Sequence, residues 1–440
     1  MATPPPDTAS PEDETPGTFT GILADDPDVV VTERAEPATV LRLPGIDNRE
    51  RSLPIRQGDL SRLLLAEPGL SDEDRKLLGE FGQILGATFH SEFYEKLREL
   101  KELYAPLDPD ADYVTLEGHT RPRSEQSDEE FLVPFEATLE KANYRQLDLQ
   151  VIEAAVSAPN ENGLTFSPDF RLFEHMKIYA RGFTRITRTY RSVKTKFLKR
   201  TVHLDAYQRL LIALKFKADP KLDPFVRSDV VYLRMFKDVP HVDMEMHLPE
   251  QGTKVRMRWI DKAQIASPLV VGLPTLAFKI LGIGVALASL SPVAMGTLII
   301  APISAGANSF FGFQRAKQRH LSHMIRSLYY LTLANNASVL TRLIDSAEDE
   351  EYKEAMLAYF FLWRAIDDPD PWDKSKLDAH IESFLEAKTG IEINFEVADA
   401  LDKLFRLGLA WRDPQGHLHA NPLPKALKAL DRAWDNTFRY

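Results

Sequence analysis

The chain has 440 residues, of which 44% are hydrophobic, and a formal net charge of −11 at pH 7. This length suggests about two or three domains with a real hydrophobic core. The absence of cysteine excludes disulfides, thiolate zinc sites and thiol nucleophiles, and the acidic balance argues against a general nucleic-acid-binding protein.

The first 48 residues predict a disordered acidic, Pro-rich tail. Residues 1–40 contain nine acids and one base, and their few apolar side chains cannot offset the entropy lost on ordering. The beginning of the chain resembles neither a secretory signal nor an Arg-rich mitochondrial presequence. We therefore expect no targeting segment here.

Residues 49–262 predict an α+β domain. Ser71 can cap a helix that stops before Pro106, and Asp74 is placed to complete a capping box. A second helix is expected over 127–143. The segments 230–236 and 254–260 predict strands, the latter because basic and apolar residues alternate along it.

Residues 263–313 predict an apolar helical hairpin that spans a membrane. Positions 268–313 hold one charged residue, Lys279, which would cost about 2.5–3.5 kcal/mol at the bilayer centre. Basic residues flank both arms, so the positive-inside rule places both large domains on the cytoplasmic side, in the cytoplasmic membrane of a bacterium. The alternative is a helical hairpin buried inside a protein core.

The remaining chain predicts a helical region over 314–369 and a winged-helix-like module over 370–440. In this module two helices end at Gly390 and Gly408, a hairpin follows over 411–419, and a last helix covers 427–438. Residues 370–440 contain ten bases and twelve acids, so we expect a protein partner here and no nucleic acid.

Several motifs together resemble one uncharacterised family. They include the segment 103–110, the segment 207–210, the segment 236–249 and the segment 353–360, with the apolar pair between the last two. Over about residues 50–440 the chain resembles the transmembrane-protein-143-like family, also called domain of unknown function 3754. The resemblance implies an integral membrane protein with no known activity, substrate or catalytic residue.

The most ligand-like cluster has four side chains at a spacing of two, namely His241, Asp243, Glu245 and His247. A strand would place all four on one face, and a helix would pair them four apart, so either could build a His/carboxylate metal site. Alternatively, the two carboxylates only charge a helical turn after Pro240. No dinucleotide, P-loop, nucleophile-elbow or zinc-protease motif is found, so no cofactor is predicted and an enzyme is disfavoured.

The strongest local charge lies in residues 169–217, which contain thirteen bases and three acids. Basic groups near a membrane attract anionic lipid headgroups by about 1 kcal/mol each. Three of the arginines would share one face if the segment were helical. The candidate headgroup-binding residues are Arg181, Arg185, Arg188, Arg191, Lys194, Lys196, Lys199 and Arg200.

These observations favour a membrane-anchored, non-catalytic scaffold or adaptor whose basic surface faces anionic lipid headgroups. The competing hypothesis is a metal-dependent enzyme centred on residues 241–247. Membrane lipids and a protein bound by the C-terminal module are the expected partners.

Overall fold

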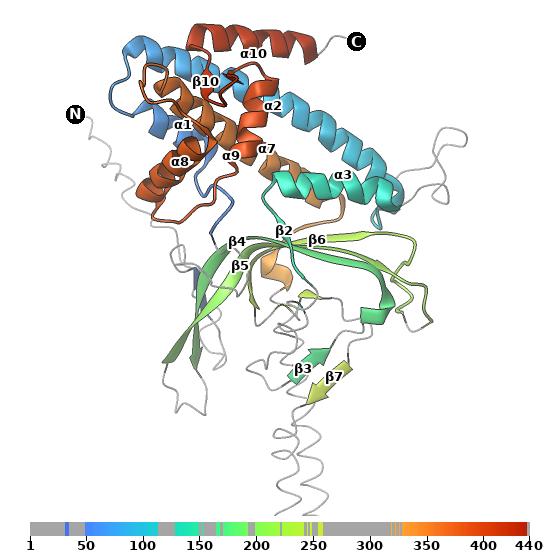
Figure 1. Cartoon of the computed structure of the whole chain (residues 1–440). Helices are drawn as coiled ribbons and strands as arrows, with labels where there is room; N and C mark the ends of the chain where they lie inside the picture. Colours follow the sequence, from blue (N-terminus) through green and yellow to red (C-terminus); the bar gives the residue numbers. More distant parts are fainter. Residues whose placement is uncertain are drawn as a thin grey trace, which may run out of the picture.

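The computed structural model describes residues 31–34, 49–112, 128–148, 152, 164–167, 170–191, 199–220, 222–241, 244, 247–248, 254–257, 318, 322, 325 and 328–437. Within these residues the chain folds as α+β, with a layer of helices over one face of an antiparallel sheet (Figure 1).

The helical layer combines segments from both ends of the sequence. Its helices are α1 (Gln57–Leu65), α2 (Asp72–Tyr104), α3 (Asp128–Lys141), α7 (Ala337–Arg364), α8 (Lys374–Thr389), α9 (Val397–Arg406) and α10 (Leu423–Thr437). The predicted capping box is confirmed, because Ser71 Oγ accepts from the Asp74 amide at 3.0 Å while Asp74 Oδ2 accepts from the Ser71 amide at 3.2 Å. One core cluster extends from Leu53 to Leu430, so the predicted segments 49–262, 314–369 and 370–440 share it.

Helix α7 lies at the centre of this layer and contacts α1, α2, α3, α8 and α9. Every residue from Glu350 to Leu362 is buried. Sequence had predicted one helical region over 314–369. Instead, α7 follows a short strand, β8 (Thr332–Asn335), which lies on the edge of the sheet.

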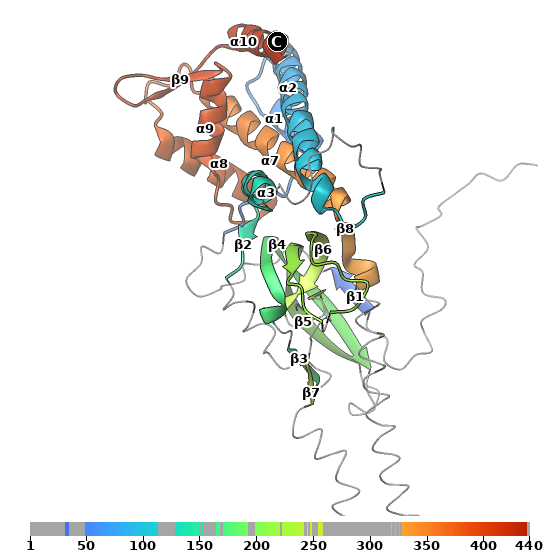
Figure 2. The same cartoon turned by 90° about the vertical axis from the view of Figure 1, so that its right-hand side faces the viewer.

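The main sheet has the order β1–β4–β5–β6–β8, with all pairs antiparallel. Its further strands are β1 (Val31–Arg34), β4 (Phe173–Arg191), β5 (Lys199–Phe216) and β6 (Tyr232–Pro240), and β2 (Arg145–Gln146) also pairs with β4. A separate pair, β3 (Leu164–Ser167) with β7 (Lys254–Met257), lies below the sheet in Figure 2. Strands β6 and β7 confirm strands within the two predicted segments. Strand β1 lies within the segment 1–48, for which disorder stays a prediction.

The alternation of side chains along the sheet shifts at one line across three strands. Ala180, Leu210 and Phe236 are aligned in the register and contact the second core cluster, on the face away from the helices. Three positions further on, Phe183, Tyr207 and Val239 contact that same cluster, although strict alternation would place them on the opposite face. Between these rows, Gly182 and Asp238 have φ of 70° and 48°. The local irregularity at these two residues therefore reorients the outer end of the β4–β5 hairpin.

The fold-class prediction is wrong in including a membrane-spanning helical pair. No helix within the described residues is both long enough and apolar enough to cross a membrane. Helix α2 has 33 residues but carries charges along its length, and the long helix α7 contains four buried charged residues. The segment 263–313, including Lys279, lies outside the described residues.

The C-terminal segment contains the predicted helices and hairpin. Helices α8 and α9 are followed by the β9 (Ala410–Arg412) and β10 (Leu418–Ala420) hairpin and then by α10. Helix α10 begins four residues earlier than predicted because Pro424 is accommodated in its first turn. The name winged-helix-like stays a prediction.

Candidate functional site

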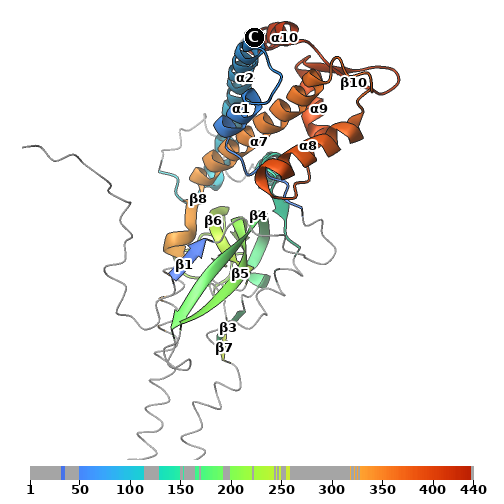
Figure 3. The ribbon, with the colours of Figure 1, turned by 90° about the vertical axis from the view of Figure 1, so that its left-hand side faces the viewer.

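The basic residues predicted to bind headgroups lie on a β-hairpin, so the helical arrangement considered for three of them is not formed. Arg188 and Arg191 are on β4, Lys199 and Arg200 are on β5, and Arg191 is directly opposite Lys199 in the register. Figure 3 shows this end of β4 and β5 extending away from the helical layer. Lys194 and Lys196 lie outside the described residues.

The two remaining arginines of this set are held by acids of the protein itself. Arg181 Nη2 lies 3.0 Å from Glu350 Oε1, and its side chain is 17% exposed. Arg185 Nε lies 3.2 Å from Asp205 Oδ1, with both side chains partly exposed. Arg181 therefore connects the sheet to α7. The headgroup-binding role stays a prediction, and it depends mainly on the residues nearer the hairpin end.

The predicted metal cluster is only half described. Asp243 and Glu245 lie outside the described residues, whereas His241 stacks on the Tyr207 ring at 4.2 Å and His247 packs edge-on against Phe236 at 4.8 Å. Burial lowers the pKa of His241, which favours the neutral imidazole that a metal requires. Its Nε2 is buried without a hydrogen-bond partner among the residues that the structure describes. The metal site therefore stays a prediction, with one imidazole suited to it.

A second group of possible ligands was not predicted from sequence. Asp128, Glu174 and His175 bring their ligand atoms within 4.8 Å of one another. However, the Lys215 ammonium is hydrogen-bonded to Asp128 and lies 3.2 Å from Glu174 Oε2. A lysine already supplies the cation at this place, so the group is an ion-pair cluster that joins β4 and β5 to α3.

The most unusual feature of the fold is a group of charged side chains that are buried together inside the helical layer. Lys403 on α9 is 4% exposed, and its Nζ lies 2.7 Å from Glu354 Oε2, 3.0 Å from Glu351 Oε2 and 2.8 Å from Asp399 Oδ2. Burial by itself lowers the pKa of Lys403, but these three carboxylates outweigh burial and raise it. The lysine is therefore a charged link between α9 and α7.

The same network continues to the sheet and to the segment before α1. Glu350 is completely buried and accepts hydrogen bonds from Arg181, from Lys353 at 2.8 Å and from the Leu53 amide at 2.9 Å. Asn143 Nδ2 lies 3.1 Å from Glu354 Oε1. Burial raises the pKa of Glu354 to about 7. The network holds four parts of the fold in one arrangement, and each of its charges has partners within the protein.

Sequence reasoning did not assign a role to this network. The signal was present in the run Glu350-Glu351-Tyr352-Lys353-Glu354, which places charges in the middle of an apolar helix. Its partners on α9, on the sheet and before α1 are far away in sequence, so no local pattern pairs them.

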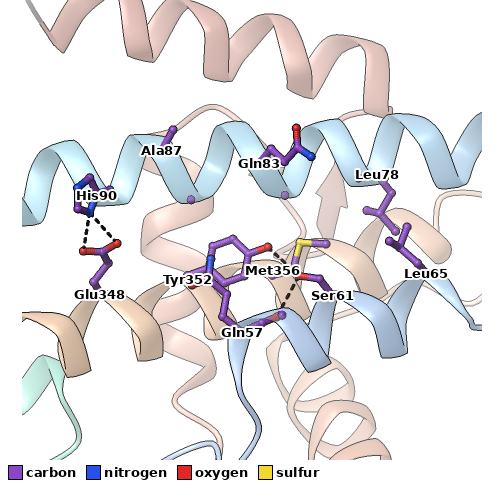
Figure 4. A pocket seen from close by; sticks show the side chains of 14 residues that line it. Gln57, Ser61, Leu65, Leu78, Gln83, Ala87, His90, Glu348, Tyr352 and Met356 are labelled. Carbon is purple, nitrogen blue, oxygen red and sulfur yellow. Dashed lines mark hydrogen bonds and ion pairs between the residues drawn. The ribbon is translucent and has the colours of Figure 1, made fainter. Parts of the chain in front are cut away.

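A hollow of about 560 Å³ lies between α1, α2 and α7 (Figure 4). Tyr352 contributes its hydroxyl, which hydrogen-bonds Ser61 Oγ at 3.1 Å. Gly82 makes room for Tyr352, because a Cβ at this position would lie 2.9 Å from the Tyr352 hydroxyl. At one end of the hollow, His90 Nδ1 lies 3.1 Å from Glu348 Oε1. These polar groups already bond to one another, so the hollow supports no particular reaction.

Comparison with known proteins adds one match. The family model described as "Protein of unknown function (DUF3754)" matches residues 180–338, from β4 through the beginning of α7. The match supports a domain of unknown function in this part of the chain and brings no activity with it. No solved structure matches the chain.

Proposed function

We propose that the protein is a non-catalytic adaptor that binds anionic lipid headgroups through the outer end of the β4–β5 hairpin. The observation that carries the proposal is the charge of this end. Residues 186–204 contain six Lys or Arg and no Asp or Glu, and the register brings Arg188, Arg191, Lys199 and Arg200 to the same end of two paired strands.

The strand register at this end of the hairpin favours binding of an anion. Like charges at directly opposed positions destabilise a strand pair, and Arg191 is opposed to Lys199. An anionic partner would offset that repulsion. A phosphate-bearing surface suits it because lysine and arginine near such a surface each gain about 1 kcal/mol.

The adaptor also needs a second contact, and we place it on the β9–β10 hairpin. Trp411 is 49% exposed and stacks on His419 at 4.4 Å. Exposed aromatic side chains of this kind are enriched at protein interfaces. This C-terminal unit is the proposed binding site for a protein partner. We also propose that the chain is related to the transmembrane-protein-143-like family.

Vesicle partitioning tests the lipid-binding half. The full chain is mixed with phosphatidylcholine vesicles with or without about 30 mol % phosphatidylserine, at salt low enough to leave surface charges unscreened. Changing Arg188, Arg191, Lys199 and Arg200 to Gln should reduce partitioning onto the anionic vesicles by about two to three orders of magnitude. The matched control changes four exposed lysines on the helices to Gln, namely Lys101, Lys374, Lys425 and Lys428.

Equal partitioning of the wild type onto neutral and anionic vesicles would refute the proposal. So would a hairpin variant that behaves like the control variant. If the chain ignored vesicles but bound an oligonucleotide through the same four residues, nucleic acid would replace lipid as the ligand.

The protein-binding half has its own test. A partner that co-purifies with the wild-type chain should be lost from the Trp411→Ala variant. It should remain on the Tyr94→Ala variant, which removes an exposed aromatic side chain from helix α2. Retention of the partner by the Trp411→Ala variant would reject the β9–β10 hairpin as its site.

A further inference from the structure

The hollow between α1, α2 and α7 is polar at one end and apolar at the other (Figure 4). His90 and Glu348 line the polar end, and Leu65 and Leu78 line the apolar end. From Leu78 to His90 the axis of α2 covers about 18 Å, since a helix rises about 1.5 Å per residue. The volume of about 560 Å³ lies in the usual range for small-molecule sites. The hollow therefore has the length and the polarity of an elongated amphiphilic molecule.

The middle of the hollow suits the apolar part of such a molecule. The Tyr352 hydroxyl hydrogen-bonds Ser61 Oγ at 3.1 Å, and Ser61 Oγ also donates to the Gln57 carbonyl oxygen at 3.1 Å. Met356 lines the hollow beside them, and its flexible thioether chain adapts to different apolar shapes. Because these hydroxyl groups are already hydrogen-bonded, an apolar chain beside them leaves no buried polar group unpaired.

The polar end of the hollow carries an excess of negative charge. Both carboxylate oxygens of Glu348 lie within 3.2 Å of His90 Nδ1, and the Glu348 side chain is 24% exposed. Burial raises the pKa of Glu348, and the charges of Asp345 and Asp349 raise it further, although His90 lowers it. Asp349 also pairs with Lys353 at 2.8 Å. Three carboxylates thus gather here with one lysine and one histidine, which favours a cation as the ligand.

His90 leaves room for such a cation. Its side chain is 72% exposed, and Glu348 is its one polar partner among the residues that the structure describes. The imidazole therefore turns into solvent without breaking another hydrogen bond. Glu348, in contrast, is held on the buried central helix α7.

We propose that the hollow binds a small amphiphilic amine, whose ammonium group pairs with Glu348 and whose apolar part lies between Leu65, Leu78 and Met356. A hydrogen bond between two charged groups contributes more than one to a neutral group, so a hydroxyl head should bind more weakly. A carboxylate head should bind most weakly, because it adds another negative charge to this end. The proposed site is separate from the basic hairpin and does not depend on lipid binding.

Three probes with the same chain and different heads test the proposal on the full-length protein. They are n-octylamine, n-octanol and n-octanoate, and calorimetric titration at neutral pH gives their affinities. The amine should bind at least about 10-fold more tightly than the alcohol, and the carboxylate should bind most weakly. In NMR spectra the methyl signal of Met356 should shift on binding. The signals of Met176 and Met235, which belong to the sheet, should stay in place.

Two variants locate the head and the chain of the ligand. Glu348→Gln should remove the preference for the amine over the alcohol, whereas Glu386→Gln, an exposed control on α8, should keep it. Gly79 lines the hollow, and a Cβ there would meet no heavy atom within 4 Å. Gly79→Leu should therefore fill part of the hollow without strain and weaken all three probes by about 10-fold. Glu99→Leu, at an exposed position of α2, is its control.

Equal wild-type affinities for n-octylamine and n-octanol would overturn the assignment of an amine, and so would a Glu348→Gln variant that keeps the preference. Binding that is unaffected by Gly79→Leu, or that shifts the methionines of the sheet and not Met356, would overturn the site. A lack of binding by all three probes would overturn the whole inference. The vesicle experiment is decided separately, because its variants change the hairpin and none of these residues.

Discussion

The ammonium nitrogen of Lys403 lies 2.7 Å from Oε2 of Glu354, and both side chains are at least 95% buried. This pair joins α9 of the C-terminal unit to the central helix α7. Removing two charges from water costs several kcal/mol per ion, and only close, hydrogen-bonded partners offset that cost. The C-terminal unit is therefore held in place by a buried contact that tolerates little change.

Replacing Lys403 with Met should destabilise the protein by about 3–5 kcal/mol, because Glu354 and Glu351 would keep buried charge without their shared cation. The free energy of unfolding from urea titration measures the loss. The control is Lys388→Met in the neighbouring helix, which removes a partly exposed pair with Glu67 and should cost less than about 1 kcal/mol. Similar losses for the two variants would contradict the assigned role of Lys403.

Stability should also depend on pH through Glu354. Its pKa in the folded state is raised to about 7, whereas the ordinary value, which the unfolded chain has, is 4.5. Between these values the folded state keeps a proton that the unfolded state has lost. The stabilisation that comes from this proton on Glu354 is therefore complete below pH 4.5. It is lost as the pH rises to 7, which lowers the free energy of unfolding by up to about 3 kcal/mol.

Urea titrations at several pH values between 4.5 and 7.5 check this dependence. Glu354→Gln should remove this decrease in the free energy of unfolding between pH 4.5 and 7, since the amide cannot ionise. The exposed Glu386→Gln change on α8 should leave the wild-type profile in place. Parallel profiles for the wild type and Glu354→Gln would show that another group causes the slope.

Local sequence signals were enough to predict most of the helical layer. Ser71 and Asp74 set the beginning of α2, and Gly390 with a φ of 70° ends α8 at the predicted place. Both features depend on neighbours within one turn. The sheet was harder to predict, because β4 and β5 form their backbone hydrogen bonds with other strands, namely with each other and with β1, β2 and β6. The face alternation of β4 also shifts near Gly182.

The buried network could not have been assembled from sequence. Glu354 and Lys403 are 49 residues apart, and Arg181 reaches Glu350 across 169 residues. In the sequence each of these residues is an ordinary charged side chain. Only the tertiary arrangement makes Arg181 a link to α7 and distinguishes it from the basic residues at the hairpin end.

The metal alternative has a direct test at its two described histidines. If residues 241–247 bind a metal, purified protein should contain it in stoichiometric amount, and changing His241 and His247 to Ala should remove it. His90 and His203 are partly or fully exposed and belong to other elements, so changing both to Ala serves as the control. Elemental analysis that finds no metal in protein supplied with zinc, manganese and iron would eliminate this alternative.

Gly182 should be needed both for the sheet and for the direction of the basic hairpin. Its φ of 70° is strained for any residue with a Cβ, and a Cβ there would lie 2.8 Å from the Gln208 side chain. Gly182→Ala should therefore cost about 2–3 kcal/mol, of which about 1 kcal/mol comes from the backbone conformation. Gly390→Ala isolates that backbone contribution, because Gly390 has the same φ and no heavy atom within 4 Å of the added Cβ. Urea unfolding of the two variants gives the difference, and equal losses would mean that Gln208 moves aside and that the contact does not constrain the sheet.

Because the Gly182–Asp238 line reorients the hairpin end, Gly182→Ala should also weaken partitioning onto phosphatidylserine vesicles under conditions where the variant is still folded.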